Sequence, residues 1–180
     1  MSKIKYKGGT AIMLKFTGEY VEPLESLRDQ IRNSENAGAW RITPPEEYHL
    51  TLQFVGRDLT SEKVSRVVFS TYVFAEDEQP FKIEFTGAVR VNRTSKGSYV
   101  VAEVLKSKDL LRMKERIVDK LAQMEIKPRD GFDFNPHVTL AEAAPGQSAP
   151  SKVANIQPFT VDCKEIVVKY GSERRLSIDL

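Results

Sequence analysis

The stretches His49-Leu50-Thr51-Leu52 and His137-Val138-Thr139-Leu140 contain the only two histidines of this 180-residue chain. On a β-strand, a His and the Thr two positions later point to the same face, about 6.6 Å apart along the strand. The apolar residues of each stretch face the other way, into a core. Each stretch therefore predicts a half-buried strand that presents one titratable ring and one hydroxyl on one surface.

The two histidine strands lie 88 residues apart, and the elements around them repeat at about the same interval. Apolar periodicity predicts strands over residues 10–16, 81–91, 98–105 and 159–170, and helices over residues 24–31, 60–75, 110–124 and, more briefly, 151–156. Ser107 is the expected N-cap of the third helix. The order strand, helix, histidine strand, helix, strand thus occurs twice. This internal duplication predicts a two-lobed α+β domain over residues 1–180, with the active face between the lobes.

Composition agrees with one compact domain. Hydrophobic residues make up 41% and charged residues 29% of the chain, as in ordinary globular proteins. No apolar run approaches the ~20 residues of a membrane span, and no signal-peptide pattern opens the chain, so we expect a cytoplasmic protein without a membrane partner. Nothing indicates an obligate protein partner, and we expect a monomer. The lone Cys163 excludes an internal disulfide, and its strand-like context favours a buried, inert thiol over a catalytic nucleophile.

Basic residues supply candidates for phosphate binding. The net charge of +2 disfavours a large nucleic-acid surface, so small patches matter more. Arg93 and Lys96 lie in a predicted hairpin turn, where they are either solvated decoration or a phosphate-steering loop. Arg129, in the loop before His137, is a further candidate to reach the phosphate. Arg174-Arg175 belongs to a terminal stretch without an assignable element and either packs as a basic tail or contacts substrate.

Three aromatic residues are candidates for substrate contacts. Phe16 ends the first strand, Tyr48 precedes His49, and Phe134 lies on the approach to His137. Each ring either stacks on a nucleobase or packs in the core or a loop. The sequence leaves both interpretations open.

Absent motifs narrow the chemistry. The chain has no His-Glu-x-x-His, no Cys-x-x-Cys, no phosphate-binding P-loop and no Gly-x-Ser-x-Gly elbow, so neither a metal site nor a cofactor is expected. Two imidazoles remain for acid–base catalysis. A free imidazole titrates near pH 6.5, so one ring can take a proton from the attacking group while its partner delivers one to the leaving oxygen. The hydroxyls of Thr51 and Thr139 can donate to the charged phosphoryl oxygens.

The two motifs resemble those of the 2H phosphoesterase superfamily, which is defined by two His-x-[Ser/Thr]-hydrophobic motifs. The stretch from Trp40 to Gly56 and the stretch Phe134-Asn135-Pro136-His137-Val138-Thr139-Leu140-Ala141 are similar to the branch of RNA 2′,3′-cyclic phosphodiesterases, also called 2′-5′ RNA ligases. Element order and spacing extend the resemblance over about residues 10–170. It implies two antiparallel sheets that face each other across a central cleft, with helices on the outside.

The resemblance also implies a function, with alternatives. It implies hydrolysis of a 2′,3′-cyclic phosphate or a 2′-5′ or 3′-5′ phosphodiester in RNA or a nucleotide, with His137 as base and His49 as acid. Members of the superfamily also degrade cyclic oligonucleotide or 2′-5′ oligoadenylate immune signals for a virus. A non-catalytic module that binds RNA ends is a further alternative, although such a module has no need of two proton-transfer groups. Glu142 stands where the branch commonly has Arg, which weakens the case for a phosphate-terminated RNA.

Overall fold

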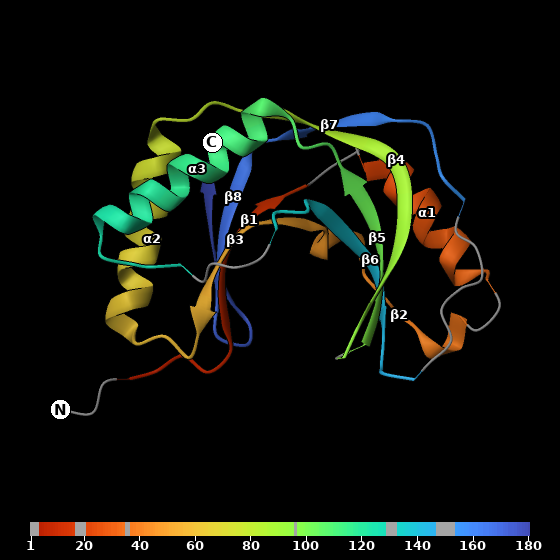
Figure 1. Ribbon diagram of the computed structural model, residues 1–180, viewed down its shortest axis with the longest axis horizontal. Helices are drawn as coiled ribbons and strands as arrows, with labels where there is room; N and C mark the ends of the chain where they lie inside the picture. The colour runs from red at the N-terminus through yellow and green to blue at the C-terminus, as the bar shows by residue number, and fades with distance from the viewer. Residues whose placement is uncertain (1–3, 17–20, 35–36, 96, 129–132, 147–153) are drawn as a thin grey trace.

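The chain folds into two lobes of antiparallel strands that meet at the two histidine strands. The computed structural model describes residues 4–16, 21–34, 37–95, 97–128, 133–146 and 154–180. Within these ranges the strand order is β7-β4-β5-β6-β3-β1-β8-β9, and β2 pairs with β6. Figure 1 shows the two groups of strands splaying apart, with helices on their outer sides. The predicted α+β fold with two lobes is confirmed.

The first lobe contains the strand that begins at His49. Its strands are β1 (Gly9–Lys15), β3 (His49–Arg57), β8 (Glu165–Tyr170) and β9 (Arg174–Asp179). The second lobe contains the strand that begins at His137. Its strands are β2 (Arg41–Ile42), β4 (Phe81–Thr94), β5 (Gly97–Val104), β6 (His137–Ala143) and β7 (Phe159–Cys163). The described parts of β3 and β6 join the lobes through the pair of Leu50 with Val138.

The helices cover the outer faces of both lobes. Helices α2 (Ser61–Glu76) and α3 (Lys108–Gln123) pack on the first lobe, and α1 (Glu22–Arg32) packs on the second. Two short 3-10 turns, η2 (Ala37–Ala39) and η3 (Pro45–Glu47), precede β3. The Ser107 hydroxyl accepts a hydrogen bond from the Leu110 amide at 3.2 Å, and such a cap stabilises a helix by about 1 kcal/mol. The three predicted long helices and this cap are confirmed.

The 88-residue repeat is visible in the fold, but the lobes are not the two halves of the chain. Strands β1 and β5 occupy equivalent positions, as do β3 and β6. Helix α3, however, follows β5 of the second lobe and packs on β3 of the first. Strand β4 precedes the second repeat, yet it pairs with β5 in the second lobe. Each lobe therefore contains segments from both halves of the chain.

The single strand predicted over residues 159–170 is wrong, because this segment forms two strands in different lobes. Strand β7 pairs with β4 in the second lobe, whereas β8 pairs with β1 in the first. The chain crosses between the lobes at Lys164. Apolar residues continue on both sides of Lys164 without Gly or Pro, so the local pattern contains no signal for the break.

The short helix predicted over residues 151–156 is not found in its described part. Residues 151–153 lie outside the described ranges, and residues 154–156 are irregular. There the Asn155 side chain accepts from the Val89 amide at 3.1 Å, and the Ile156 amide donates to the Gly87 carbonyl at 2.9 Å. Gly87 has a φ of 81°, and a Cβ at this position would collide with the Ile156 carbonyl. Close backbone pairing with β4 thus replaces helical hydrogen bonding.

The core lies on the helix-covered faces of the strands. Leu50, Leu52, Val138 and Leu140 are at most 1% exposed, so the apolar positions of both motifs face inward as predicted. Cys163 is also buried, and burial raises the pKa of its thiol to about 12. A thiol held neutral in this way is a poor nucleophile, which agrees with the interpretation of Cys163 as inert. Among the described helices, none combines the length and apolarity needed to cross a membrane.

Candidate active site

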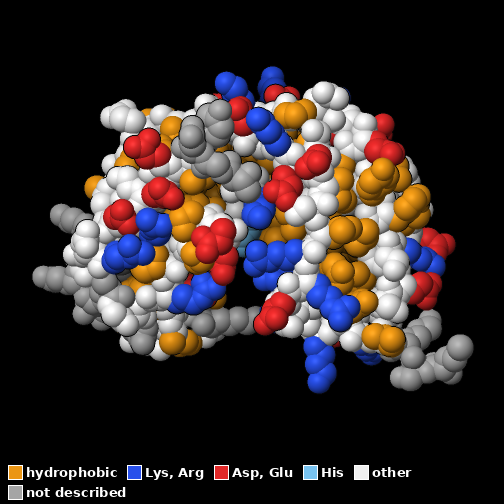
Figure 2. All heavy atoms as spheres, turned by 180° about the vertical axis from the view of Figure 1, so that it is seen from behind, with side chains coloured by type: hydrophobic (Ala, Val, Ile, Leu, Met, Phe, Trp, Pro, Cys, Tyr) orange, Lys and Arg blue, Asp and Glu red, His pale blue; other side chains and the backbone are white. Residues whose placement is uncertain are grey.

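The pair of Leu50 with Val138 brings the two motifs side by side. The pairing is antiparallel, so this register places His49 across from Thr139 and Thr51 across from His137. All four side chains lie on the face opposite Leu50 and Val138, which are fully buried. The site thus has an approximate twofold symmetry about the central pair. Figure 2 shows a hollow between the lobes with a histidine at its floor and charged side chains around it.

Both histidine rings are held in the same way. Nδ1 of His49 lies 2.7 Å from the Glu47 carbonyl oxygen, and Nδ1 of His137 lies 2.7 Å from the Asn135 carbonyl oxygen. A carbonyl oxygen only accepts hydrogen bonds, so Nδ1 carries the proton in each ring. Nε2 is then the nitrogen that exchanges a proton with a ligand. The turn η3 and the Asn135-Pro136 segment supply these carbonyls directly before the strands.

His49 lies in surroundings that disfavour its charged form. The pKa of His49 is lowered, first by burial and then by the positive charges of Lys169 and Arg175. The hydrogen bond to the Glu47 carbonyl and the Glu47 carboxylate act in the opposite direction without reversing the shift. The neutral ring that results in the free protein is the form that a general base needs. The expectation that His49 is the acid therefore receives no support from these charges.

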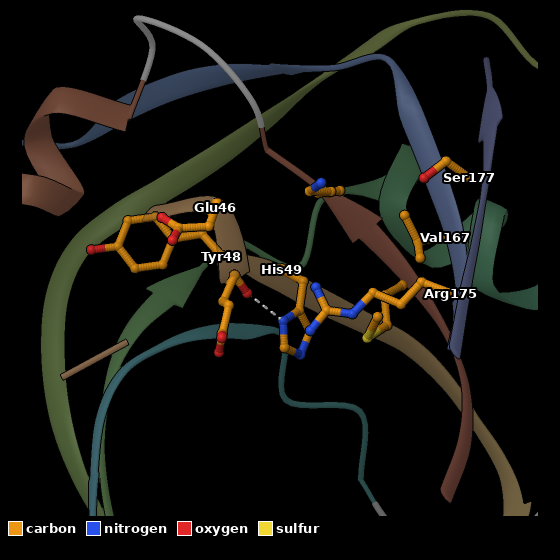
Figure 3. Close-up of a pocket in the computed structure, with 9 residues that line it drawn as sticks. Glu46, Tyr48, His49, Val167, Arg175 and Ser177 are labelled. Carbon is orange, nitrogen blue, oxygen red and sulfur yellow. Dashed lines mark hydrogen bonds between the residues drawn. The ribbon is translucent and has the colours of Figure 1, made fainter. Parts of the chain in front are cut away.

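A small pocket adjoins His49. It is lined by Met13 and Lys15 of β1, residues 46–49, Val167 of β8, and Arg175 and Ser177 of β9. Figure 3 shows Arg175 extending from β9 toward the His49 ring. The basic side chains of this pocket and Lys169 make the first lobe the positively charged side of the site.

Arg41 and Arg90, two arginines of the second lobe, are paired with carboxylates. Arg90 lies 3.1 Å from Glu103, and Arg41 lies 3.0 Å from Glu47 and 3.4 Å from Glu142. Glu142 stands where the branch that this sequence resembles commonly has Arg, and Arg41 of β2 is its basic neighbour. Arg41 does not substitute for the positive charge of that Arg, because it is already shared between the carboxylates of Glu47 and Glu142.

Two of the predicted aromatic contacts are core residues instead. Phe16 is 1% exposed and packs edge-on against Phe85, with ring centroids 5.9 Å apart. Tyr48 is fully buried, and burial raises the pKa of its hydroxyl to about 12. Both rings are covered, so neither is available to stack on a base. Phe134 is half-buried, with the Lys114 Nζ 4.7 Å from its ring centroid, and remains a candidate.

The predicted basic contacts are only partly described. Lys96 and Arg129 lie outside the described residues. Arg93 pairs with Ser98, whereas Arg90 pairs with Val101, which in turn pairs with Thr139. Side chains alternate along a strand, so Arg90 is on the histidine face and Arg93 is on the opposite one. A contact of Arg93 with the reacting phosphate is therefore not supported.

The cations that reach His49 were not among the predicted site residues. Arg175 appeared in the sequence only as a basic tail or a substrate contact, and the structure places it in the pocket. Lys15 pairs with His49 across β1 and β3. A signal was available for Lys15, because it alternates with buried residues of a predicted strand. The positions of Lys169 and Arg175 relative to His49 depend on the pairing of β8 with β1 and with β9, which no local pattern specifies.

The sequence matches the family model of the 2'-5' RNA ligase superfamily over residues 29–173. The chain belongs to this superfamily. The resemblance carried by the two histidine motifs is confirmed. Membership supports a phosphodiesterase-type activity in general terms. A comparison with curated proteins gave no match for this superfamily member.

Several solved structures share the fold of this superfamily member. TT0787 of Thermus thermophilus matches with a TM-score of 0.65 at 16% identity, covering 96% of this chain and 95% of that chain. E. coli LigT complexed with 3'-AMP matches with a TM-score of 0.62 at 15% identity, covering 98% and 96%. Kluyveromyces marxianus Usb1 matches with a TM-score of 0.60 at 13% identity, covering 97% and 99%. At these identities the likeness shows the fold.

Proposed function

We propose that this protein is a metal-independent phosphodiesterase that hydrolyses a 2′,3′-cyclic phosphate, or a 2′-5′ or 3′-5′ phosphodiester, in RNA or a nucleotide. The observation that carries the proposal is the symmetric pair of rings. In each histidine ring, Nδ1 donates to a backbone carbonyl, so Nε2 is left for a ligand. Thr51 and Thr139 lie on the same face of the strands as the two rings. LigT, a structural neighbour, has been seen with 3'-AMP, which agrees with a nucleotide substrate.

In the proposed reaction a water molecule attacks the phosphorus atom of the substrate. Nε2 of His49 takes a proton from the water as its oxygen bonds to phosphorus. The bond from phosphorus to the leaving ribose oxygen breaks, and His137 delivers the Nε2 proton to that oxygen. The Thr51 and Thr139 hydroxyls donate hydrogen bonds to the non-bridging oxygens, whose negative charge grows in the transition state.

The test of this function is hydrolysis of 2′,3′-cyclic AMP in the presence of excess EDTA. We expect turnover to persist, because the proposed proton transfers and hydrogen bonds use only side chains of the protein. A large loss that added metal restores would contradict the mechanism. A panel with cyclic-phosphate-ended RNA, 2′-5′ oligoadenylate and cyclic dinucleotides, assayed in the same buffer, identifies the preferred linkage.

We assign His49 as the base because burial and the nearby positive charges lower its pKa, which leaves His137 as the acid. A nitrophenyl phosphodiester has a leaving group that needs little protonation, so it separates the two roles. On this substrate we expect His137→Ala to lose ~10²-fold less activity than on the cyclic nucleotide, because the general acid is no longer needed. His49→Ala should lose its activity on both substrates. The opposite ranking would exchange the roles, and equal losses would contradict the assignment.

The pH dependence of kcat/KM gives a second readout of the same assignment. Activity should fall as pH decreases through the pKa of His49, which lies below its usual value of about 6.5. Lys169 lowers this pKa through its positive charge. Lys169→Gln should therefore raise the pKa and move the acidic limb to higher pH. Lys82→Gln, at an exposed position on β4, is the control and should leave the limb in place.

A further inference from the structure

Lys15, Lys169 and Arg175 form a cluster of positive charge on the first-lobe side of His49, with Glu165 as the cross-strand partner of Lys15. Lys169 of β8 and Arg175 of β9 are direct cross-strand partners, and like charges in that position destabilise a sheet. In the described part of the chain, no carboxylate lies within 4.0 Å of the charged nitrogens of Lys15, Lys169 or Arg175. A local conflict of this kind is typical of a functional site, where a ligand supplies the missing charge.

The cations of the cluster differ from other arginines around the site in having no ion-pair partner among the described residues. Arg41 and Arg90 of the second lobe each have a carboxylate partner. Arg174, next to Arg175 along β9, instead lies over the Tyr6 ring at 5.0 Å. Arg175 is thus available to a ligand, while the neighbouring arginines are engaged within the protein.

The pocket that holds Arg175 is displaced from the point of bond cleavage. The scissile phosphate must lie among the four motif residues, because Nε2 of both rings has to reach it. The pocket is lined by His49 but not by Thr51, His137 or Thr139. A group bound there is consequently next to the reacting phosphate and not in its place.

The side chains that line the pocket suit an anionic group. Lys15, Arg175 and the Ser177 hydroxyl supply hydrogen-bond donors around apolar Met13 and Val167. Glu47, which also lines it, is paired with Arg41, and Glu46 is exposed.

We propose that this pocket binds a second phosphate of the substrate, adjacent to the phosphate that is cleaved. The substrate is then a nucleotide or oligonucleotide with at least one further phosphate, such as a 5′-phosphate or the next linkage of an RNA chain. This inference rests on the proposed function, since it takes the motif residues as the place of cleavage. Arg175 is its principal contact, and Lys15 and Lys169 add positive charge.

The test compares two ligands that differ by one phosphate. Binding of 3′-AMP and of adenosine 3′,5′-bisphosphate to the full chain is measured by titration calorimetry at fixed ionic strength. We expect the bisphosphate to bind at least ~10-fold more tightly, the effect of one strong charged hydrogen bond. Arg175→Gln should abolish this preference while changing the affinity for 3′-AMP by less than ~3-fold.

The matched control is Arg174→Gln, which removes the same charge from the adjacent position of β9. This variant should keep the preference for the bisphosphate. Equal affinities of the wild-type protein for both ligands, no binding of either, or an equal loss for both in Arg175→Gln would overturn the inference. Hydrolysis of 2′,3′-cyclic AMP is followed separately. If hydrolysis fails while the bisphosphate preference holds, the proposed function is wrong and the second phosphate site stands.

Discussion

Replacing either His49 or His137 by Ala is expected to lower kcat by ~10²–10⁴, the usual contribution of a general acid or base. Each ring is only half-buried, so the fold should survive its removal. The measurement is kcat on 2′,3′-cyclic AMP, with the melting temperature of each variant as the check on folding. Near-normal turnover in either variant would contradict the two-histidine mechanism.

Asn variants sharpen this test. An Asn amide can donate to the Glu47 or Asn135 carbonyl as Nδ1 does now, but it cannot transfer the Nε2 proton. His→Asn should therefore lose as much activity as His→Ala. If Asn restored activity, the rings would be positioning residues for the preceding loops. Arg57→Ala, exposed at the far end of β3, is the control for substitution in the same strand.

Thr51→Val and Thr139→Val are expected to lower kcat by roughly 10–10³, as the loss of one transition-state hydrogen-bond donor does. Val keeps the branched shape of Thr and removes only the hydroxyl. Each hydroxyl lies across from the histidine of the other motif, near the phosphoryl oxygens in the proposed reaction. The readout is the separation of kcat from KM.

The Ser variants provide the matched control for the threonines. Thr→Ser keeps the hydroxyl, so it should retain most of the activity that Thr→Val loses. Thr139 is less exposed than Thr51, and a donor shielded from water contributes more. Thr139→Val is accordingly expected to have the larger effect. A change confined to KM would make the hydroxyls ground-state binding groups instead.

Most secondary structure could be predicted because it follows from local periodicity. The helix that begins after Ser107 has apolar residues at helical spacing and a capping hydroxyl, and both are properties of a few neighbouring residues. The segment around Lys164 failed because the same alternation suits one long strand or two short ones. Only the choice of partners, β4 for β7 and β1 for β8, separates these possibilities.

In the candidate site, too, local sequence predicted some residues, whereas tertiary packing placed the others. Tyr48 directly precedes His49 and Phe16 ends the first predicted strand, but neither position along the chain decides whether a ring faces substrate or core. Packing buries both. Arg175 lies 126 residues after His49 in a stretch without a recognisable pattern, and it reaches the pocket because the β8–β9 hairpin extends the first lobe.

Local alternation was enough to predict that two strands each present a His and a Thr on one face, since the period of a strand is two residues. The repeated order of the surrounding elements was equally readable from the chain. The pairing of Leu50 with Val138, which puts each histidine across from the other motif's threonine, depends on the tertiary structure. The tertiary structure alone placed Lys169 and Arg175 beside His49 and lowered its pKa. These are contacts between segments far apart in the chain, and their energies depend on burial and distance, which local patterns do not specify.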